Sequence, residues 1–142
     1  MVATVLSAMA IPALASDAGL IKVSKGNVQI ERNGARMAAP VGASVQASDV
    51  ITTGADGSAG ITFTDNSLVS VGPNTVFAID KYRFDSTTHA GEFEGSLKKG
   101  RLAAISGKMV KASPESMKIR TPSAIMGVRG TEFVVQVDEE KK

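Results

Sequence analysis

The feature that most constrains this chain is an alternation of apolar and polar residues with a period of two. Ile61 and Phe63 alternate with the threonines beside them, and no stretch of twelve residues after Ser16 sustains the apolar spacing of a helix. Successive side chains of a β-strand point to opposite faces of a sheet, so this pattern predicts strands with one buried face. The same alternation recurs in Val69–Val71, Phe77–Asp80, Tyr82–Phe84 and Phe133–Val137.

Turn-forming residues interrupt these runs at intervals of about ten residues, the spacing of an all-β sandwich or roll. The Asn33-Gly34 pair is the sharpest of these signals, because both residues tolerate the positive φ angles of a two-residue type I′ turn. It predicts a hairpin between Val28–Arg32 and Ala35–Ala39. Asn33-Gly34 therefore sets the register of one strand pair from the sequence alone.

The Asp65-Asn66 pair predicts a second hairpin, between residues 60–64 and 67–71. Together these signals predict a single all-β domain of short antiparallel strands and hairpins, with a sandwich-like or roll-like architecture. Residues 106–115, rich in Gly, Ser and Pro, are expected to form a loop. The expected core contains Ile61, Phe63, Val71, Phe77, Ile79, Phe133 and Val135.

Residues 1–15 carry no charge and end in Pro12-Ala13-Leu14-Ala15, which is typical of a signal peptide with its cleavage site before Ser16. The alternative is an N-terminal strand or core helix. No Lys or Arg precedes the apolar stretch, and we therefore expect that the natural start lies upstream. This interpretation predicts export to the bacterial periplasm, with the extracellular space as the alternative. We expect residues 20–137 to form the domain and residues 138–142 a polar tail.

Composition excludes several classes of function. Sixteen Lys and Arg residues against fourteen Asp and Glu residues give a net charge of +2, too little to favour nucleic acid as a partner. The chain has no Cys and one His, which argues against zinc sites, thiol chemistry and catalytic triads. Its aromatic content is 4% with no Trp, which leaves little for stacking nucleic-acid bases. We therefore expect no catalytic residue, no metal and no cofactor.

The few residues that could carry chemistry have simpler interpretations. His89 lies in a polar segment and is expected to be an exposed loop residue. Four acidic residues lack the spacing of a calcium loop and are interpreted as turn formers: Asp49, Asp56, Asp65 and Asp80.

Basic and glycine-rich segments receive similar structural interpretations. The Lys98-Lys99-Gly100-Arg101 cluster and Arg120 are interpreted as a solvated sheet edge, because exposed cations discourage edge pairing. The segment 127–131 lacks the Lys and the helix of a phosphate loop, so Gly127 and Gly130 are expected to form a tight turn between strands.

Several segments in order resemble the FecR domain, and the resemblance extends from about Gly26 to Val137. Asn66 stands where that family usually has Gly, a change that the turn should tolerate because Asn also adopts positive φ angles. The segments that carry the resemblance are Val41–Gly54, Gly57–Ser67, Val69–Thr75, Leu97–Gly100, Ile119–Ala124 and Val128–Phe133.

The resemblance implies an all-β periplasmic domain. In the regulators that give the family its name, this domain relays a signal from an outer-membrane transporter loaded with ferric siderophore to a cytoplasmic sigma factor. We expect no transmembrane segment after Ser16 and no anti-sigma segment, so the iron-signalling role does not transfer directly. A stand-alone secreted FecR-domain protein is the better likeness.

These observations predict a non-enzymatic interaction or sensing module that binds an envelope protein through an exposed strand edge or a loop face. The alternative is a protein that binds a small ligand or a cell-wall polysaccharide, for which Tyr82 is the available stacking residue.

Thr121-Pro122 and Gly130 are expected to have architectural roles. Arg129 is the candidate partner contact, although an internal tie to loop carbonyls is favoured.

Overall fold

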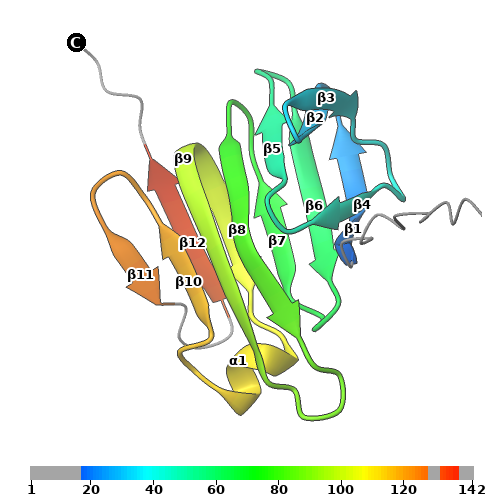
Figure 1. Cartoon of the computed structure of the whole chain (residues 1–142). Coiled ribbons are helices and arrows are strands. Elements are labelled where there is room, and N and C mark those ends of the chain that lie inside the picture. The colour runs from blue at the N-terminus through cyan, green and yellow to red at the C-terminus, as the bar shows by residue number, and fades with distance from the viewer. Residues whose placement is uncertain (1–16, 128–131, 138–142) are drawn as a thin grey trace, which may run out of the picture.

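A computed structural model of the chain describes residues 17–127 and 132–137. These residues form twelve strands and one short helix, which confirms the all-β class. The strands make two sheets that face each other and share one long strand, β9 (Gly91–Ile105) (Figure 1). The predicted signal peptide, the polar tail and Arg129 all lie outside the described residues.

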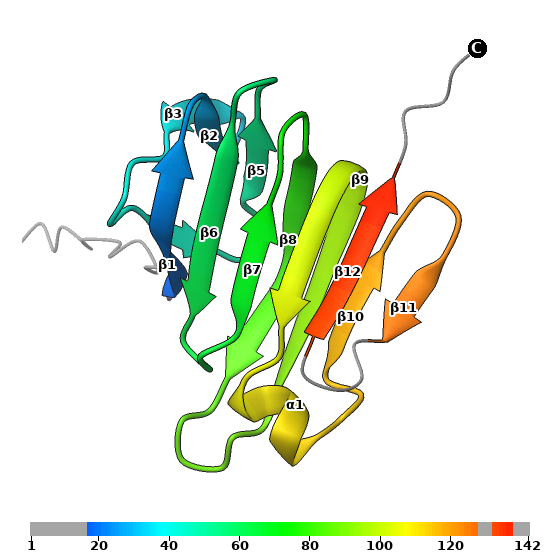
Figure 2. The ribbon, with the colours of Figure 1, turned by 180° about the vertical axis from the view of Figure 1, so that it is seen from behind.

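The two sheets meet along β9 and are otherwise built from separate strands. Figure 2 shows the strands of sheet A side by side. Sheet A contains, in spatial order, β4 (Ser44–Gln46), β1 (Asp17–Lys25), β6 (Ser58–Phe63), β7 (Leu68–Val71), the end of β9 and β12 (Glu132–Val137). Sheet B contains β3 (Ala35–Ala38), β2 (Val28–Arg32), β5 (Val50–Thr53), β8 (Val76–Phe84), the start of β9, β10 (Met117–Arg120) and β11 (Ile125–Gly127).

Neighbouring strands are antiparallel, as predicted, except in one place. β10 runs parallel to the start of β9, with Met117 opposite Phe93 and Arg120 opposite Ser96. The long connection between these strands allows this, because parallel neighbours cannot be joined by a tight hairpin. β10 then pairs with β11 through an antiparallel hairpin.

Both predicted hairpins are present. Asn33 and Gly34 have φ angles of 52° and 79°, and Arg32 pairs directly with Ala35, which confirms the two-residue turn. The second hairpin joins β6 to β7 through a longer loop, closed by a hydrogen bond from the Phe63 N–H to the Ser67 carbonyl. Asn66 has a φ angle of 69°, so it adopts the left-handed conformation that was expected of it.

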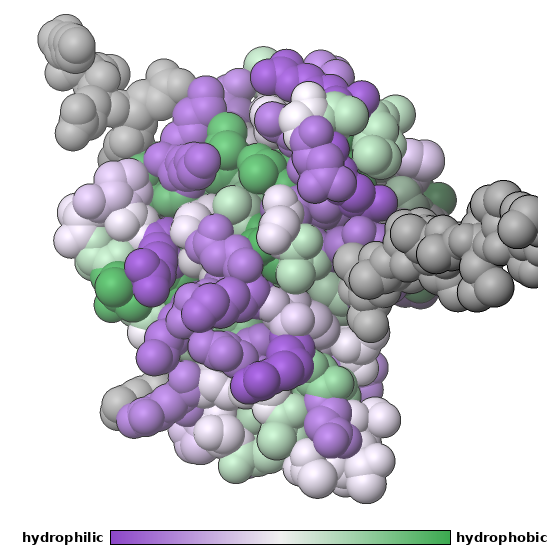
Figure 3. Space-filling view, in the orientation of Figure 1, coloured by the Kyte–Doolittle hydropathy of each residue, from purple (hydrophilic) through white to green (hydrophobic). Residues whose placement is uncertain are grey.

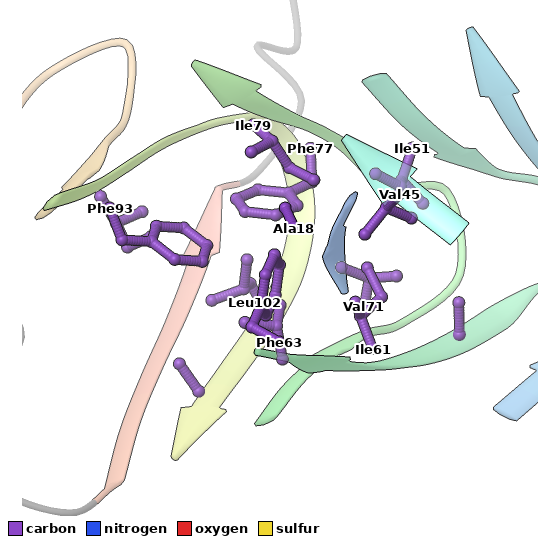
Figure 4. Packing of buried hydrophobic residues seen from close by; sticks show 14 of the residues in the cluster. Ala18, Val45, Ile51, Ile61, Phe63, Val71, Phe77, Ile79, Phe93 and Leu102 are labelled. Carbon is purple, nitrogen blue, oxygen red and sulfur yellow. The ribbon is translucent and has the colours of Figure 1, made fainter. Parts of the chain in front are cut away.

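The core lies between the two sheets. Figure 4 shows Phe63, Phe77, Phe93 and Leu102 pointing into the same space, and the Phe63 and Phe93 rings meet edge to face at 4.7 Å. Six of the predicted core residues are buried: Ile61, Phe63, Val71, Phe77, Ile79 and Val135. The seventh, Phe133, is only partly buried, because β12 is the last strand of sheet A and has the core on part of its inner face only.

The segment 106–115 was predicted to be a loop, and this is wrong in part. Lys108–Ala112 forms the helix α1, which lies at one end of the space between the sheets (Figure 1). Met109 and Val110 are buried, and the Lys108 N–H donates to the Asp65 carbonyl at 2.8 Å. A single helical turn is too short to produce a periodic apolar pattern, so the sequence carried no signal for it.

The two lateral sides of the sandwich differ. On the side of β1 and β4, residues 39–43 cross between the sheets. The Ile21 N–H donates to Ala43 at 2.8 Å, and the Ala39 N–H donates to Val28 at 3.1 Å. On the opposite side, β12 pairs with the end of β9 in sheet A, and β10 pairs with the start of β9 in sheet B (Figure 2). On this second side the described residues leave a hollow between the two sheets.

Candidate functional site

The open side of the sandwich holds a groove with a volume of about 990 Å³. Its walls are the turn between β10 and β11 on one side and the end of β12 on the other. It is larger than the hollow beside residues 83–91, of about 560 Å³, and the one between β2 and β3, of about 270 Å³. The groove is lined by Lys98, Lys99, Thr121, Pro122, Ser123, Ala124, Met126, Val135, Gln136 and Val137.

The floor of the groove is the part of β9 where this strand passes from one sheet to the other. β10 pairs with β9 as far as Ser96, and β12 pairs with it from Gly100 onward. Gly100 has a φ angle of 96°, which residues with a side chain rarely adopt, and it produces the change in direction. The groove thus lies between the ends of two strand pairings on the same edge of β9.

The groove has an apolar inner side and a polar outer side, because side chains alternate along each strand. Met126 and Val137 are partly buried against the core and Val135 is buried, so these three side chains form the inner side. Leu97 points into the core with no exposed surface, whereas the next residue, Lys98, is exposed on the outer face. Lys98 therefore lines the outer side of the groove.

A fixed turn forms one wall. The Thr121 N–H donates to the Ala124 carbonyl at 2.8 Å, and the Ala124 N–H donates to the Thr121 hydroxyl at 3.1 Å. Pro122 lies two residues after the end of β10, so the strand stops before it as predicted, and its ring limits the backbone at the second position of the turn. These residues hold the wall in shape and also line the groove, so they do more than end a strand.

The basic cluster was predicted to lie on a sheet edge, and this is wrong in part. Gly100 and Arg101 pair with β12, whereas Lys98 and Lys99 lie between the pairings of β9 with β10 and with β12, where that edge has no strand neighbour among the described residues. Arg120 lies on the outer face of β10 within 3.9 Å of Glu94. Figure 3 shows the hydrophilic residues that cover the face formed by β8, β9 and β10. The pattern of charges alone could not distinguish an edge strand from an exposed face of an interior strand.

Two of the four acidic residues are buried, and both fix turns. Asp49 accepts the Gln46 N–H at 2.8 Å and forms a two-pronged ion pair with Arg32, at 2.7 and 2.9 Å. This hydrogen bond from Arg32 to Asp49 raises the pKa of the guanidinium above its ordinary value. Asp65 accepts the N–H of Ser67 at 3.0 Å and its hydroxyl at 2.7 Å.

The other two acidic residues are exposed. Asp56 accepts the Asn27 N–H at 3.3 Å, which joins two turns. Asp80 does not form a turn, contrary to the prediction, because it lies within β8 at an irregularity in the pairing with β9, where it accepts the Ser96 hydroxyl. Within residues 17–127 and 132–137, no three His, Cys, Asp or Glu side chains are close enough together to hold a metal ion.

Tyr82 and His89 both pack against aromatic rings. The Tyr82 ring lies 5.3 Å from Phe63 and 5.5 Å from Phe93, and its hydroxyl lies 2.7 Å from that of Thr64. Burial raises the pKa of Tyr82 to about 12. His89 lies in the turn after β8, as predicted, but it is partly buried and stacks on Phe84 at 6.0 Å. Both rings are thus partly buried among other aromatic side chains.

Gly127 is not part of a turn, contrary to the prediction. It is the last residue of β11, pairs with Lys118, and has open space where a Cβ atom would lie. The predicted roles of Arg129 and Gly130 fall outside the described residues. The groove itself was missed, since the sequence does not show that β10 and β12 meet β9 on the same edge.

The family model described as FecR protein matches residues 49–142. The chain belongs to the FecR family. The match covers Asp65-Asn66-Ser67, which fixes the β6–β7 loop, and Thr121–Ala124, which forms a wall of the groove. Searches of curated proteins and of solved structures return no match. Family membership fits a role in signalling or sensing. In the described part of the FecR chain, no helix is long and apolar enough to cross a membrane.

Proposed function

We propose that this FecR-family protein is a non-enzymatic sensing module of the bacterial envelope, and that it binds another protein in the groove between β12 and the β10–β11 hairpin. The observation that carries the proposal is the position of the groove. It lies between two strands, β11 and β12, each of which has one strand neighbour among the described residues. An extended segment of a partner can add to such edges through backbone hydrogen bonds.

Location in the periplasm is part of the proposal. It rests on the apolar stretch at residues 1–15 with its Ala13 and Ala15 cleavage signal, and on membership of the FecR family. N-terminal sequencing of the protein from the periplasmic fraction should give Ser16 as the first residue. Mature protein that retains residues 2–15 would contradict this part of the proposal.

Binding of a polysaccharide is the less favoured alternative. Sugar rings are usually bound by stacking on exposed aromatic faces, and Tyr82 is held within the cluster of Phe63 and Phe93. The groove has no aromatic residue in its lining, which consists of aliphatic side chains, Met126, two lysines and the polar side chains of Thr121, Ser123 and Gln136. Such a lining suits a polypeptide better than a sugar.

Site-specific photocrosslinking in living cells tests the proposal. A photoreactive amino acid replaces Ser123, which is exposed on the groove wall, and in a matched variant it replaces Ser70, which is exposed on the outer face of sheet A. We expect one discrete protein adduct from position 123 and none from position 70. Mass spectrometry then identifies the partner and the segment that it inserts. Equal labelling from both positions, or no adduct from position 123, would refute binding in the groove.

A further inference from the structure

The two sides of the groove differ in chemistry, and this difference restricts what can bind there. Met126, Val135 and Val137 lie on the inner side, next to the core. Of the charged residues in the lining, Lys98 is exposed on the outer face of β9. The groove therefore offers an apolar surface toward the space between the sheets and the positive charge of Lys98 toward its outer side.

A β-strand presents its side chains in the matching arrangement. Because successive side chains point to opposite faces, a strand in the groove directs alternate residues inward and the others outward. The inner positions meet Met126, Val135 and Val137, where apolar side chains gain from burial. The outer positions lie on the face of Lys98, whose ammonium group favours a carboxylate.

We propose that the partner inserts an extended segment in which apolar residues alternate with acidic ones, so that its backbone pairs with an edge of the groove while a carboxylate meets Lys98. This inference rests on the proposed function, since it names the chemistry of the segment that the groove would bind. β12 provides an edge of six residues, and β11 provides one of three. The inserted strand would cover the open side of the sandwich, as residues 39–43 cover the other side.

The groove is suited to this segment before it binds. Hydrogen bonds within the Thr121–Ala124 turn fix one wall, and the pairing of β12 with β9 at Leu102–Val135 fixes the other. A partner that binds to an already ordered edge loses less conformational entropy than one that must order both sides. Backbone pairing alone does not discriminate between sequences, so the apolar side chains and Lys98 provide the specificity.

Fluorescence anisotropy with labelled, acetylated peptides tests the inference on the full chain. The probe is an eight-residue peptide of alternating valine and glutamate, compared with a valine–lysine peptide of the same length. A third peptide carries N-methyl groups on alternate residues and cannot pair along one of its edges. We expect the glutamate peptide to bind at least about tenfold more tightly than the other two, because charge reversal and loss of pairing each weaken the contact.

Charge reversal on the protein provides the matched control. Lys98→Glu should weaken binding of the glutamate peptide about tenfold and strengthen binding of the lysine peptide. Lys81→Glu reverses an exposed lysine on β8, outside the groove lining, and should leave both affinities unchanged. Thermal denaturation of each variant checks that the fold is retained.

Several outcomes would overturn the inference. If the peptides do not bind while the crosslink from position 123 persists, the partner does not insert an alternating acidic strand, although the proposed function stands. Competition by glutarate as effective as by the peptide would assign the groove to a small acid. Self-association that Lys98→Glu abolishes would assign it to a second copy of the chain. Loss of the crosslink as well would refute the proposed function itself.

Discussion

Replacement of Gly100 by alanine tests the central feature of the fold, the passage of β9 from sheet B to sheet A. Gly100 has a φ angle of 96°, and a Cβ atom added there would lie 2.5 Å from the Thr75 Cα and 2.7 Å from the Thr75 Cβ. The Thr75 Cα belongs to the backbone and the Thr75 Cβ is bonded directly to it, so no side-chain rotation can relieve the contact. Either the strand or the 73–75 turn must move.

The expected cost has two parts. A residue with a side chain at positive φ loses about 1–3 kcal/mol, and forcing atoms into a packed site costs about another 1–3 kcal/mol. Gly100→Ala should therefore reduce the free energy of unfolding by about 2–6 kcal/mol. For a domain of this size, each kcal/mol lowers the melting temperature by about 4 °C. Movement of Thr75 would also disturb its hydroxyl, which accepts the Arg101 N–H at 3.1 Å.

Two other glycines separate these contributions. Gly34 has a φ angle of 79° but open space around a Cβ atom, so Gly34→Ala should cost the backbone part alone. Gly127 also has open space and no positive φ, so Gly127→Ala should leave stability nearly unchanged or raise it slightly. Urea denaturation of the three variants should give this order. A cost for Gly100→Ala no larger than that for Gly34→Ala would refute the close approach of β9 to Thr75.

Three further predictions concern buried groups. Arg32→Ala leaves the buried Asp49 carboxylate without its cation and should lower the free energy of unfolding, measured in urea, by about 3 kcal/mol. Arg32→Lys should be intermediate, because lysine keeps the charge and loses the two-pronged geometry. Unchanged stability of both variants would contradict this. Tyr82 is the single tyrosine of the chain, so its phenolate absorbance should report a pKa of about 12 in the folded protein, against about 10 in the unfolded chain. Because the fold favours the neutral phenol, the contribution of Tyr82 to stability is complete below pH 10 and is lost as the pH rises through 12. Phe133 is partly buried, so Phe133→Ala should lower the free energy of unfolding by about 1–2 kcal/mol. Phe93 is fully buried, so Phe93→Ala should lower it by about 3–5 kcal/mol. Equal losses for the two variants would place Phe133 in the core.

The hairpins could be predicted from the sequence because their signals are local. Asn33-Gly34 specifies a two-residue turn whatever the rest of the chain does, and it fixes the pairing of Arg32 with Ala35. Alternation of side chains likewise identifies the buried face of each strand, which is why Ile61 and Phe77 were placed correctly in the core. Neither signal depends on which strands become neighbours.

The groove could not be predicted, because it depends on contacts between distant segments. Lys98 looks the same in the sequence whether it lies on an edge strand or on the outer face of an interior strand. Its position is fixed by the parallel pairing of β10 with residues 93–96 and by the antiparallel pairing of β12 with residues 100–105. Partial exposure of Phe133 follows from the same arrangement, since alternation indicates the direction of a side chain and not how much of the core covers it.

Asp65 makes contacts with distant segments as well as the local contacts of a turn former. As a turn former it needs only its bonds to Ser67. In the fold, the Asp65 carboxylate also accepts the Met109 N–H of α1 at 3.4 Å. The backbone of Asp65 makes two more contacts: its N–H donates to the Tyr82 hydroxyl at 3.1 Å, and its carbonyl accepts the Lys108 N–H. One residue thus joins the β6–β7 loop, β8 and α1 at the same end of the sandwich. A buried residue whose carboxylate, N–H and carbonyl bond to three segments fixes their relative positions, because each lost partner would leave a buried polar group unpaired. The closed end is therefore held by polar contacts around Asp65, and the open groove lies where β10 and β12 separate along β9.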